Sequence, residues 1–314
     1  MKILFVSSGN SENGVSPIVK RQGNSISETG INVHYFPIKG KGFKGYLSNI
    51  KTLKQTIREM QPDIIHAHYS MSAFTATLAG AKPLVVSLMG SDVMASGILK
   101  LIIIFFIKLF WNHTIVKSQD MQKSLGLKNV SVIPNGVDKR LFKPIEKAHS
   151  CDKLNWNKNK KHILFAANPI RHEKNFNLAK KSINKLNQKD IELHSLIKTR
   201  HANVPLRMNA ADVVVLTSLY EGSPNVIKEA MACSRPIVAT DVGDIKWLFD
   251  NEPGHYISSF SPIDMAKKIE FALEFSEKKR RTNGKERIIK LGLDSKSIAN
   301  RIIDVYKNVL AKNE

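Results

Sequence analysis

The chain of 314 residues contains little of what marks several common classes of protein. Its two cysteines, Cys151 and Cys233, stand at no metal-binding or redox spacing, which excludes a disulfide framework. Aromatic residues make up 7% of the chain and do not alternate with basic residues, as base-stacking platforms for nucleic acid do. The first apolar segment is not followed by G-x-G-x-x-G, the fingerprint of nicotinamide cofactor binding. That segment is also too short for a signal peptide, so we expect a cytoplasmic protein.

Acidic residues are scarce relative to basic ones. The chain has 48 Lys and Arg against 27 Asp and Glu, a formal charge of +21. The surplus is divided almost evenly between residues 1–150 and 151–314, which argues against a basic arm for nucleic acid. An anionic substrate, an anionic membrane surface and simple solubility all remain compatible with it. Apolar residues make up 42% of the chain, as in folded globular proteins.

Apolar segments of strand length alternate with amphipathic helical segments along the whole chain. Strands are expected at residues 3–6, 31–37, 64–68 and 83–89, and again at 162–166, 213–217 and 236–240. A polar segment rich in Lys and Asn, residues 146–161, is the expected linker. The prediction is an α/β chain of two doubly wound, Rossmann-like domains, at 1–150 and 151–294, whose ligand lies beyond the carboxyl ends of the strands.

Residues 98–111 (ILKLIIIFFIKLFW) form the most apolar segment. Spanning a bilayer takes about 20 residues, so this segment is too short to do so. Either it lies in a membrane interface with Lys100 and Lys108 against anionic lipid, or it is a buried helix of the first domain.

The segment with the most chemical information is residues 217–233, TSLYEGSPNVIKEAMAC. A strand is expected to end at Thr217, with Ser223 as the N-cap and Pro224 as the first residue of the next helix. The N-terminus of that helix offers free N–H groups to an anionic ligand. Glu221 and Glu229 can face the same ligand from the loop and the helix.

Glu221 and Glu229, with seven residues between them, resemble the paired glutamates of the retaining glycosyltransferases of family 4. Residues 62–70, 132–142, 209–222 and 236–243 resemble further segments of that family, in the same order. The resemblance implies two facing Rossmann-like domains, the GT-B fold, with a C-terminal helix at 295–314 that packs back on the first domain. It also implies a nucleotide-sugar donor and no metal or other cofactor.

The resemblance implies roles for individual residues. Glu229 would accept hydrogen bonds from the ribose of the donor, and Glu221 would lie beside the transferred sugar. Lys174, with Arg171 as a less regularly spaced partner, would stabilise the negative charge of the diphosphate. Backbone groups would complete the donor site, at Gly14, Gly222, Ser223, Pro224, Asn225 and Val226.

The sequence departs from the family pattern at two places. Met89 stands where a histidine before a glycine is common, so His68 or Asp92 is the candidate replacement for that histidine. His68 could equally be a hydrogen-bonded structural residue. Asp92 and Asn135 are expected on the acceptor side. The interval 193–209 is short, which removes some expected contacts with the nucleobase.

The leading hypothesis is a retaining glycosyltransferase that moves a sugar, of hexosyl type, from a nucleotide diphosphate to an acceptor hydroxyl. A lipid-linked oligosaccharide in surface polysaccharide or glycolipid assembly is the expected acceptor, reached at the inner face of a membrane, and no nucleic acid partner is expected. Two alternatives remain: a catalytically silent scaffold of the same fold, and a basic protein that binds nucleic acid or other anions.

Overall fold

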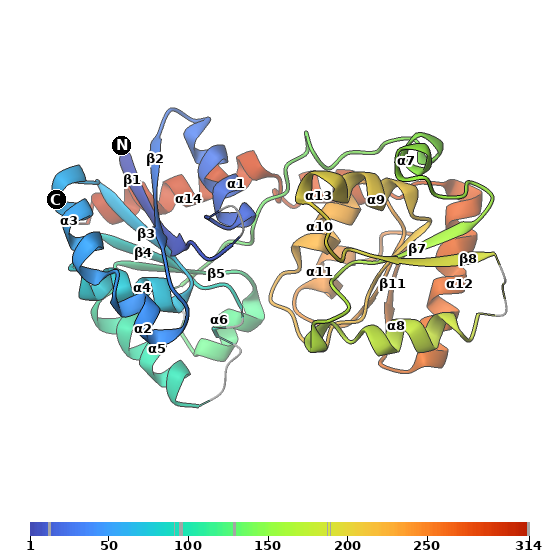
Figure 1. Ribbon diagram of the computed structural model, residues 1–314, viewed down its shortest axis with the longest axis horizontal. Coiled ribbons are helices and arrows are strands. Elements are labelled where there is room, and N and C mark those ends of the chain that lie inside the picture. The colour runs from blue at the N-terminus through green and yellow to red at the C-terminus, as the bar shows by residue number, and fades with distance from the viewer. Residues whose placement is uncertain are drawn as a thin grey trace. The chain divides into compact units, whose positions relative to one another are not determined.

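The computed structural model describes residues 1–11, 14–90, 92–93, 97–127, 130–186, 188 and 190–312 (Figure 1). It divides into two compact units. The first consists of Met1–Gly136 and Ser295–Glu314, and the second of Val137–Asp294. The division therefore falls before the expected boundary at residue 150.

The first unit is built on a six-stranded sheet in the order β2-β1-β3-β4-β5-β6, with every pair parallel. Its central strands are continuous apolar runs because helices cover both faces of a parallel sheet. The strands are β1 (Lys2–Ser8), β2 (Asn32–Ile38), β3 (Ile64–His68), β4 (Leu84–Ser87), β5 (His113–Val116) and β6 (Ser131–Val132).

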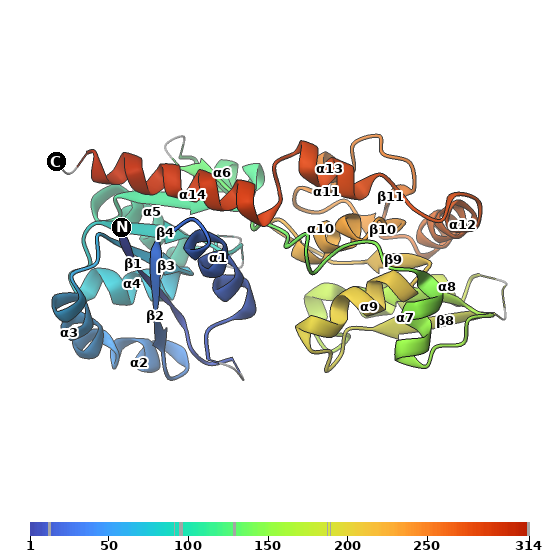
Figure 2. The ribbon, with the colours of Figure 1, turned by 90° about the horizontal axis from the view of Figure 1, so that it is seen from above.

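Helices of the first unit pack on the two faces of this sheet. Leu4, Val6 and Val86 face a core shared with α3 to α6, while helix α14 lies beside α1 (Figure 2). Tyr306 of α14 is fully buried, and its Oη lies 2.6 Å from Nδ1 of His66 on β3. The helices are α1 (Pro17–Ser27), α2 (Gly42–Leu47), α3 (Ile50–Met60), α4 (Ser70–Leu78), α5 (Ile98–Leu109), α6 (Gln119–Leu125) and α14 (Ser295–Leu310).

The second unit contains a five-stranded parallel sheet in the order β11-β10-β9-β7-β8. Alternate residues of its strands, such as Ile163 and Val213, pack against α8 and α12. Its strands are β7 (Lys161–Phe165), β8 (Ile191–Ser195), β9 (Val213–Leu216), β10 (Ile237–Thr240) and β11 (His255–Ser258). Its helices are α7 (Lys147–Leu154), η1 (His172–Lys174), α8 (Phe176–Ile183), η2 (His201–Asn203), α9 (Val204–Ala210), α10 (Asn225–Ala232), α11 (Ile245–Phe249), α12 (Pro262–Lys279) and α13 (Gly284–Lys290).

The prediction of two doubly wound α/β sheets is confirmed, but the predicted linker at 146–161 is wrong. Half of it is helix α7, which packs on α9. Ser150 and Cys151 are fully buried, and Nζ of Lys147 lies 2.6 Å from Oδ1 of Asp212. This polar segment can still pack against its neighbours, because the small side chains of Ser150 and Cys151 form the buried face of α7.

Helix α5, the most apolar segment, is not the buried helix that one interpretation expected. Ile103 is its one fully buried residue, while Leu101 is 67% exposed and Phe105 is 53% exposed. The other large apolar side chains exposed along and after this helix are Ile98, Ile102, Leu109 and Phe110. Among the described residues, no helix is long and apolar enough to cross a membrane.

Candidate active site

The loop after β9 is tied to its neighbours at the carboxyl end of the second sheet. Thr217 Oγ1 lies 2.8 Å from the carbonyl oxygen of Lys174, in the segment that follows β7. The amide of Leu219 donates to the carbonyl of Glu173 over 2.9 Å. From the other side, Thr240 Oγ1 at the end of β10 donates to the carbonyl of Ser218 over 2.7 Å. Three strand ends therefore hold this loop.

The structure brings Lys174 and Glu221 together as an ion pair. Their side chains are 12% and 14% exposed, so the pair is largely shielded from water. Ser218 Oγ donates a second hydrogen bond to the same Glu221 oxygen over 2.7 Å. Opposite charges held in such a place attract more strongly than at the surface, and removal of one leaves the other uncompensated. Because the two residues are 47 positions apart, no local sequence pattern indicates this contact.

Gly243 allows the loop after β10 to approach the loop of Glu221. Its φ is +61°, a conformation that favours glycine. A Cβ at this position would lie 2.5 Å from the carbonyl oxygen of Gly222 and 3.0 Å from that of Glu221. Any side chain here would displace the backbone that carries the first glutamate.

Helix α10 begins one residue later than the sequence predicts. Pro224 is the N-cap and Asn225 the first helical residue, and the cap residue makes no side-chain hydrogen bond. Ser223 is therefore not the N-cap: its Oγ instead lies 3.0 Å from Nζ of Lys228. Asn225 Oδ1 is buried without a hydrogen-bond partner among the described residues, and Val226 follows it in the first turn. The prediction of Ser223 as the N-cap is wrong, because its hydroxyl oxygen accepts a hydrogen bond from the ammonium of Lys228 instead of from a backbone amide of the helix.

Glu229 is buried in α10, with 7% of its surface exposed. Its Oε1 lies 3.4 Å from Nε2 of His201, in the short helix η2. The His201 ring packs edge-on against Phe142 at 5.4 Å between centroids. Sequence reasoning missed His201, because it lies in the interval 193–209 that was judged only by its length.

Lys228 is a second residue that sequence reasoning missed. It is fully buried beside Glu229, and burial lowers the pKa of its ammonium to about 8, with the charges of Asp244 and Glu229 opposing that shift. Its place within the otherwise apolar run VIKEAMA was the available signal. A buried cation below the loop 221–224 adds positive potential next to the backbone groups expected to contact the donor.

The lowered pKa of Lys228 predicts how stability changes at alkaline pH. Between about pH 8 and its ordinary pKa of 10.5 the unfolded chain holds this proton and the folded chain does not, so the free energy of unfolding rises with pH. Across that pH range, the free energy of unfolding of the wild-type chain should rise by about 3 kcal/mol relative to that of the Lys228→Met variant. Urea unfolding of both proteins at several pH values measures the difference, and parallel pH profiles would contradict the prediction.

Arg171 does not join Lys174 in the structure. Its side chain is 58% exposed, and its Nη2 lies 2.5 Å from Oε1 of Glu173. The guanidinium of Arg171 is therefore paired with a carboxylate only two residues further along the same loop. Lys174 and Arg171 thus have different acidic partners in the structure, and their expected roles as phosphate ligands stay predictions.

In the first unit, His68 lies in the core at the end of β3. The ring is 1% exposed, stacks on His66 at 4.3 Å and contacts Phe5, so it is buried among aromatic neighbours. Burial, together with the charge of Lys117, holds its pKa well below the usual range, and the ring is neutral. Neither ring nitrogen has a hydrogen-bond partner among the described residues.

Asp92 shapes the turn that follows β4. Its Oδ1 accepts from the amides of Met89 and Gly90 over 2.9 and 3.0 Å, and its Oδ2 accepts from the amide of Ser70 over 3.1 Å. Burial raises the pKa of this carboxyl, and the three backbone hydrogen bonds oppose the increase. At 1% exposure Asp92 is a positioning residue for this turn and the start of α4.

The remaining predicted positions of the first unit lie in loops. Gly14 has a φ of +77° and accepts a hydrogen bond at its carbonyl from Ser11 Oγ. A Cβ on Gly14 would meet no atom within 4 Å, so its conformation, not crowding, favours glycine. Asn135 follows β6, close to the end of the unit, with its Oδ1 buried.

Two family models match the chain, one in each unit. Residues 15–120 match the model described as "Glycosyl transferase 4-like", and residues 158–274 match "Glycosyl transferases group 1". A provisionally assigned teichuronic acid biosynthesis glycosyltransferase of Bacillus subtilis is 28% identical over 232 residues, which cover 64% of this chain. The chain spans 58% of the length of that relative.

Solved structures share the fold over nearly the whole chain. Sucrose-phosphate synthase from Thermosynechococcus elongatus has a TM-score of 0.83 at 15% identity, covering 99% of this chain and 100% of that one. HepE of Anabaena, solved in complex with UDP-glucose, has a TM-score of 0.76 at 18% identity, covering 98% and 100%. The chain therefore has the GT-B glycosyltransferase fold. Each of its two units carries a glycosyltransferase domain match.

Proposed function

We propose that the chain is a retaining glycosyltransferase that uses a nucleotide-sugar donor. The single observation that supports this most is the shielded ion pair of Lys174 and Glu221 at the carboxyl end of the second sheet. Glu229 lies eight residues after Glu221 on α10, at the spacing of the paired glutamates. A cation and a carboxylate paired at the loop, with a second carboxylate on the helix that follows it, suit the phosphate, the sugar and the ribose of one ligand.

In this proposal each charged group has a distinct task. Lys174 stabilises the negative charge that appears on the diphosphate as the sugar–phosphate bond breaks, so no metal is needed. Glu221 lies beside the sugar ring, which gains positive charge as the same bond breaks. Glu229 holds the ribose. Arg171 would have to leave Glu173 to reach the phosphates, so we assign it a minor contribution.

Retention follows from front-face transfer. The bond between the anomeric carbon and the phosphate oxygen breaks, and the acceptor oxygen bonds to the same face of that carbon. The acceptor's proton passes to the departing phosphate oxygen, which balances the reaction without a covalent intermediate. Asp92 suits no nucleophilic role, because backbone amides occupy both of its oxygens.

Hydrolysis of donors tests the activity directly. The purified chain would be incubated with a panel of nucleotide diphosphate sugars, and release of the nucleotide would be followed by chromatography. At least one donor should be cleaved, and the Lys174→Ala variant should lose that activity. Binding without cleavage, across the panel and with added acceptor sugars, would favour the catalytically silent scaffold.

We further propose a lipid-linked acceptor at an anionic membrane surface. The support is helix α5, where Leu101 and Phe105 lie exposed one turn apart and Lys108 is exposed beside them. Exposed apolar side chains with nearby lysines suit the interface of an anionic bilayer. The net charge of +21 adds a general attraction to the inner membrane face.

Vesicle flotation should show binding to anionic membranes that weakens as salt increases, since each basic residue near the surface contributes about 1 kcal/mol. Leu101→Glu with Phe105→Glu should abolish it, because both side chains are exposed and their replacement leaves the core intact. Phe260→Glu with Ile263→Glu is the matched control: these side chains are also exposed, but lie in the second unit. Equal recovery with neutral vesicles would contradict the electrostatic contribution, and unchanged binding of the α5 variant would exclude the helix.

A further inference from the structure

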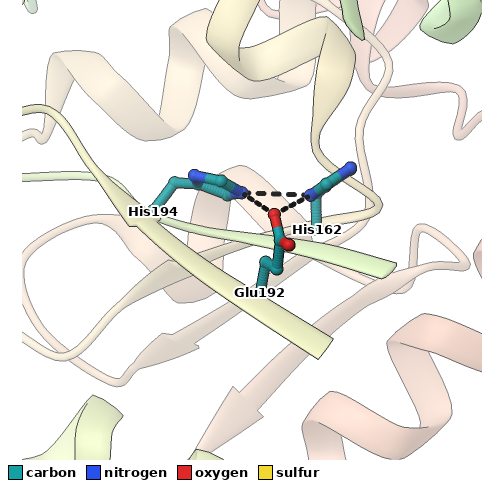
Figure 3. A group of neighbouring side chains, drawn as sticks. All are labelled: His162, Glu192 and His194. Atoms are coloured by element: carbon teal, nitrogen blue, oxygen red, sulfur yellow. Dashed lines mark hydrogen bonds and ion pairs between the residues drawn. The ribbon is translucent and has the colours of Figure 1, made fainter. Parts of the chain in front are cut away.

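Three side chains with metal-binding atoms converge on the neighbouring strands β7 and β8. Figure 3 shows Glu192 and His194 projecting from one strand toward His162 on its neighbour. The parallel register places His162 opposite Glu192, and His194 follows two residues later on the same face. The loop that carries Glu221 lies beyond the carboxyl end of β9 in the same sheet. The cluster of His162, Glu192 and His194 has no role in the proposed transfer reaction.

The hydrogen bonds of His162 leave one ring nitrogen available as a ligand. Its Nε2 lies 2.9 Å from the carbonyl oxygen of Asn157, and a carbonyl only accepts, so Nε2 carries the proton. Nδ1 therefore has a lone pair, and it points at Nε2 of His194 over 3.0 Å. A histidine that binds a metal commonly donates its other N–H to a carbonyl in this way.

The distances between the three ligand atoms are close to the edges of a tetrahedron around a zinc ion, with the distance between the two histidines shorter than such an edge. His162 Nδ1 and His194 Nε2 are 3.0 Å apart, and Glu192 Oε2 lies 3.7 Å from the first and 3.6 Å from the second. Bonds of about 2.0–2.2 Å to Zn²⁺ give tetrahedral edges of about 3.3–3.6 Å. Two imidazoles suit zinc and its neighbours in the first transition series better than Mg²⁺ or Ca²⁺, which prefer oxygen ligands.

Neighbouring residues hold this group in place and leave one side open. Lys160 Nζ pairs with the other carboxylate oxygen of Glu192 over 3.0 Å, which turns Oε2 toward the histidines. Trp156 stacks on the His194 ring, with 3.5 Å between centroids and an angle of 11°. The side chain of His162 is fully buried, whereas that of Glu192 is 32% exposed. Solvent can thus reach the cluster past Glu192 and supply a fourth ligand.

We propose that His162, Glu192 and His194 form a structural Zn²⁺ site that joins the edge strand β8 to β7. On binding, the proton of His194 Nε2 moves to Nδ1 of the same ring, and both facing nitrogens then bind the ion. The edge strand gains most from such a link, because in the sheet it pairs with β7 alone. The site is independent of the transfer reaction, whose proposed residues lie in the segment after β7, in the loop after β9 and on α10.

Zinc titration of the full chain without a histidine tag tests the site. After dialysis against zinc, elemental analysis should find one ion per chain, and saturating zinc should raise the unfolding midpoint of the wild type by several degrees. His194→Ala and Glu192→Gln should each weaken zinc binding by at least about tenfold. His149→Ala, which removes an exposed histidine of the same unit, should leave the affinity unchanged.

A paramagnetic probe provides an independent readout. Because Trp156 stacks on His194, Co²⁺ at this site should quench part of the tryptophan fluorescence, and Trp156→Phe should remove that part while zinc still binds. Absence of bound zinc at millimolar concentration would overturn the proposal and leave His194 and His162 as a hydrogen-bonded pair. Equal zinc affinity in the Glu192→Gln, His194→Ala and His149→Ala variants would also overturn it. Neither result would affect donor cleavage, so the test is separate from that of the proposed function.

Discussion

Replacement of Lys174 by alanine should lower turnover by roughly a hundredfold or more, the scale of losing one preorganised group that stabilises developing charge. In the structure this ammonium is 12% exposed and paired with Glu221, so it already lies in a place where its charge is weakly screened. The variant also leaves Glu221 with Ser218 as its partner. Initial rates of donor cleavage and of transfer would measure the loss.

Two variants separate this chemical effect from a change in stability. Arg171→Ala should lower turnover much less, because that guanidinium is exposed and bound to Glu173. Lys180→Ala removes an exposed cation of the same unit and should have no effect. Activity should persist in chelator below the unfolding temperature, since no metal takes part in the proposed step. Recovery of a chelated enzyme only with a divalent cation would contradict the role of Lys174.

The two glutamates should fail in different ways. Glu229→Ala should chiefly raise the KM for the donor, because hydrogen bonds to ribose exist in both the bound donor and the transition state. A charge-assisted hydrogen bond of about 1.5–3 kcal/mol corresponds to roughly 10–150-fold. Glu221→Gln should chiefly lower kcat, because a carboxylate beside the sugar helps most when the ring becomes positive. Steady-state kinetics over a range of donor concentrations distinguishes the two.

Binding of the free nucleoside diphosphate is the control for these assignments. It has the ribose and lacks the sugar, so its affinity should fall in Glu229→Ala and stay nearly unchanged in Glu221→Gln. His201→Ala is an added comparison, since its ring contacts Glu229 and its loss should weaken the nucleotide modestly. The reverse pattern of affinities would show that the roles of the two acids are exchanged.

The paired glutamates were accessible to sequence reasoning because their relation is local. Glu221 lies in the loop between β9 and α10, and Glu229 lies on α10, so both fall within the one short segment that carries the resemblance. The contact of Lys174 with Glu221 is not local: the resemblance identified the lysine, but only the hydrogen bonds of Thr217 and Leu219 to its loop hold the two side chains together. The burial of Lys228 and the contact of His201 with Glu229 likewise depend on tertiary packing and not on local sequence.

Burial was the property that sequence patterns predicted least well. Residues 146–161 are polar enough for a linker, yet α7 packs on α9 through two small side chains and an ion pair to Asp212. Helix α5 shows the opposite error, since an apolar run all round would suit a core, but the sheet covers one side of it and leaves Leu101 and Phe105 exposed. The hydrophobicity of a side chain indicates whether burial is favourable, whereas the packing of neighbouring helices and strands determines how much of its surface is buried.

Local hydrogen bonding and side-chain periodicity are written into consecutive residues, so the alternation of strands and helices, and with it the class of fold, followed from the chain alone. Strand register and loop packing join residues far apart, and no short window of sequence contains them. The register of β7 against β8 brings His162 to Glu192 and His194, and the approach of Gly243 to Gly222 sets the loop of Glu221. Those contacts exist only once the sheet has assembled, because each needs two strands at a defined offset.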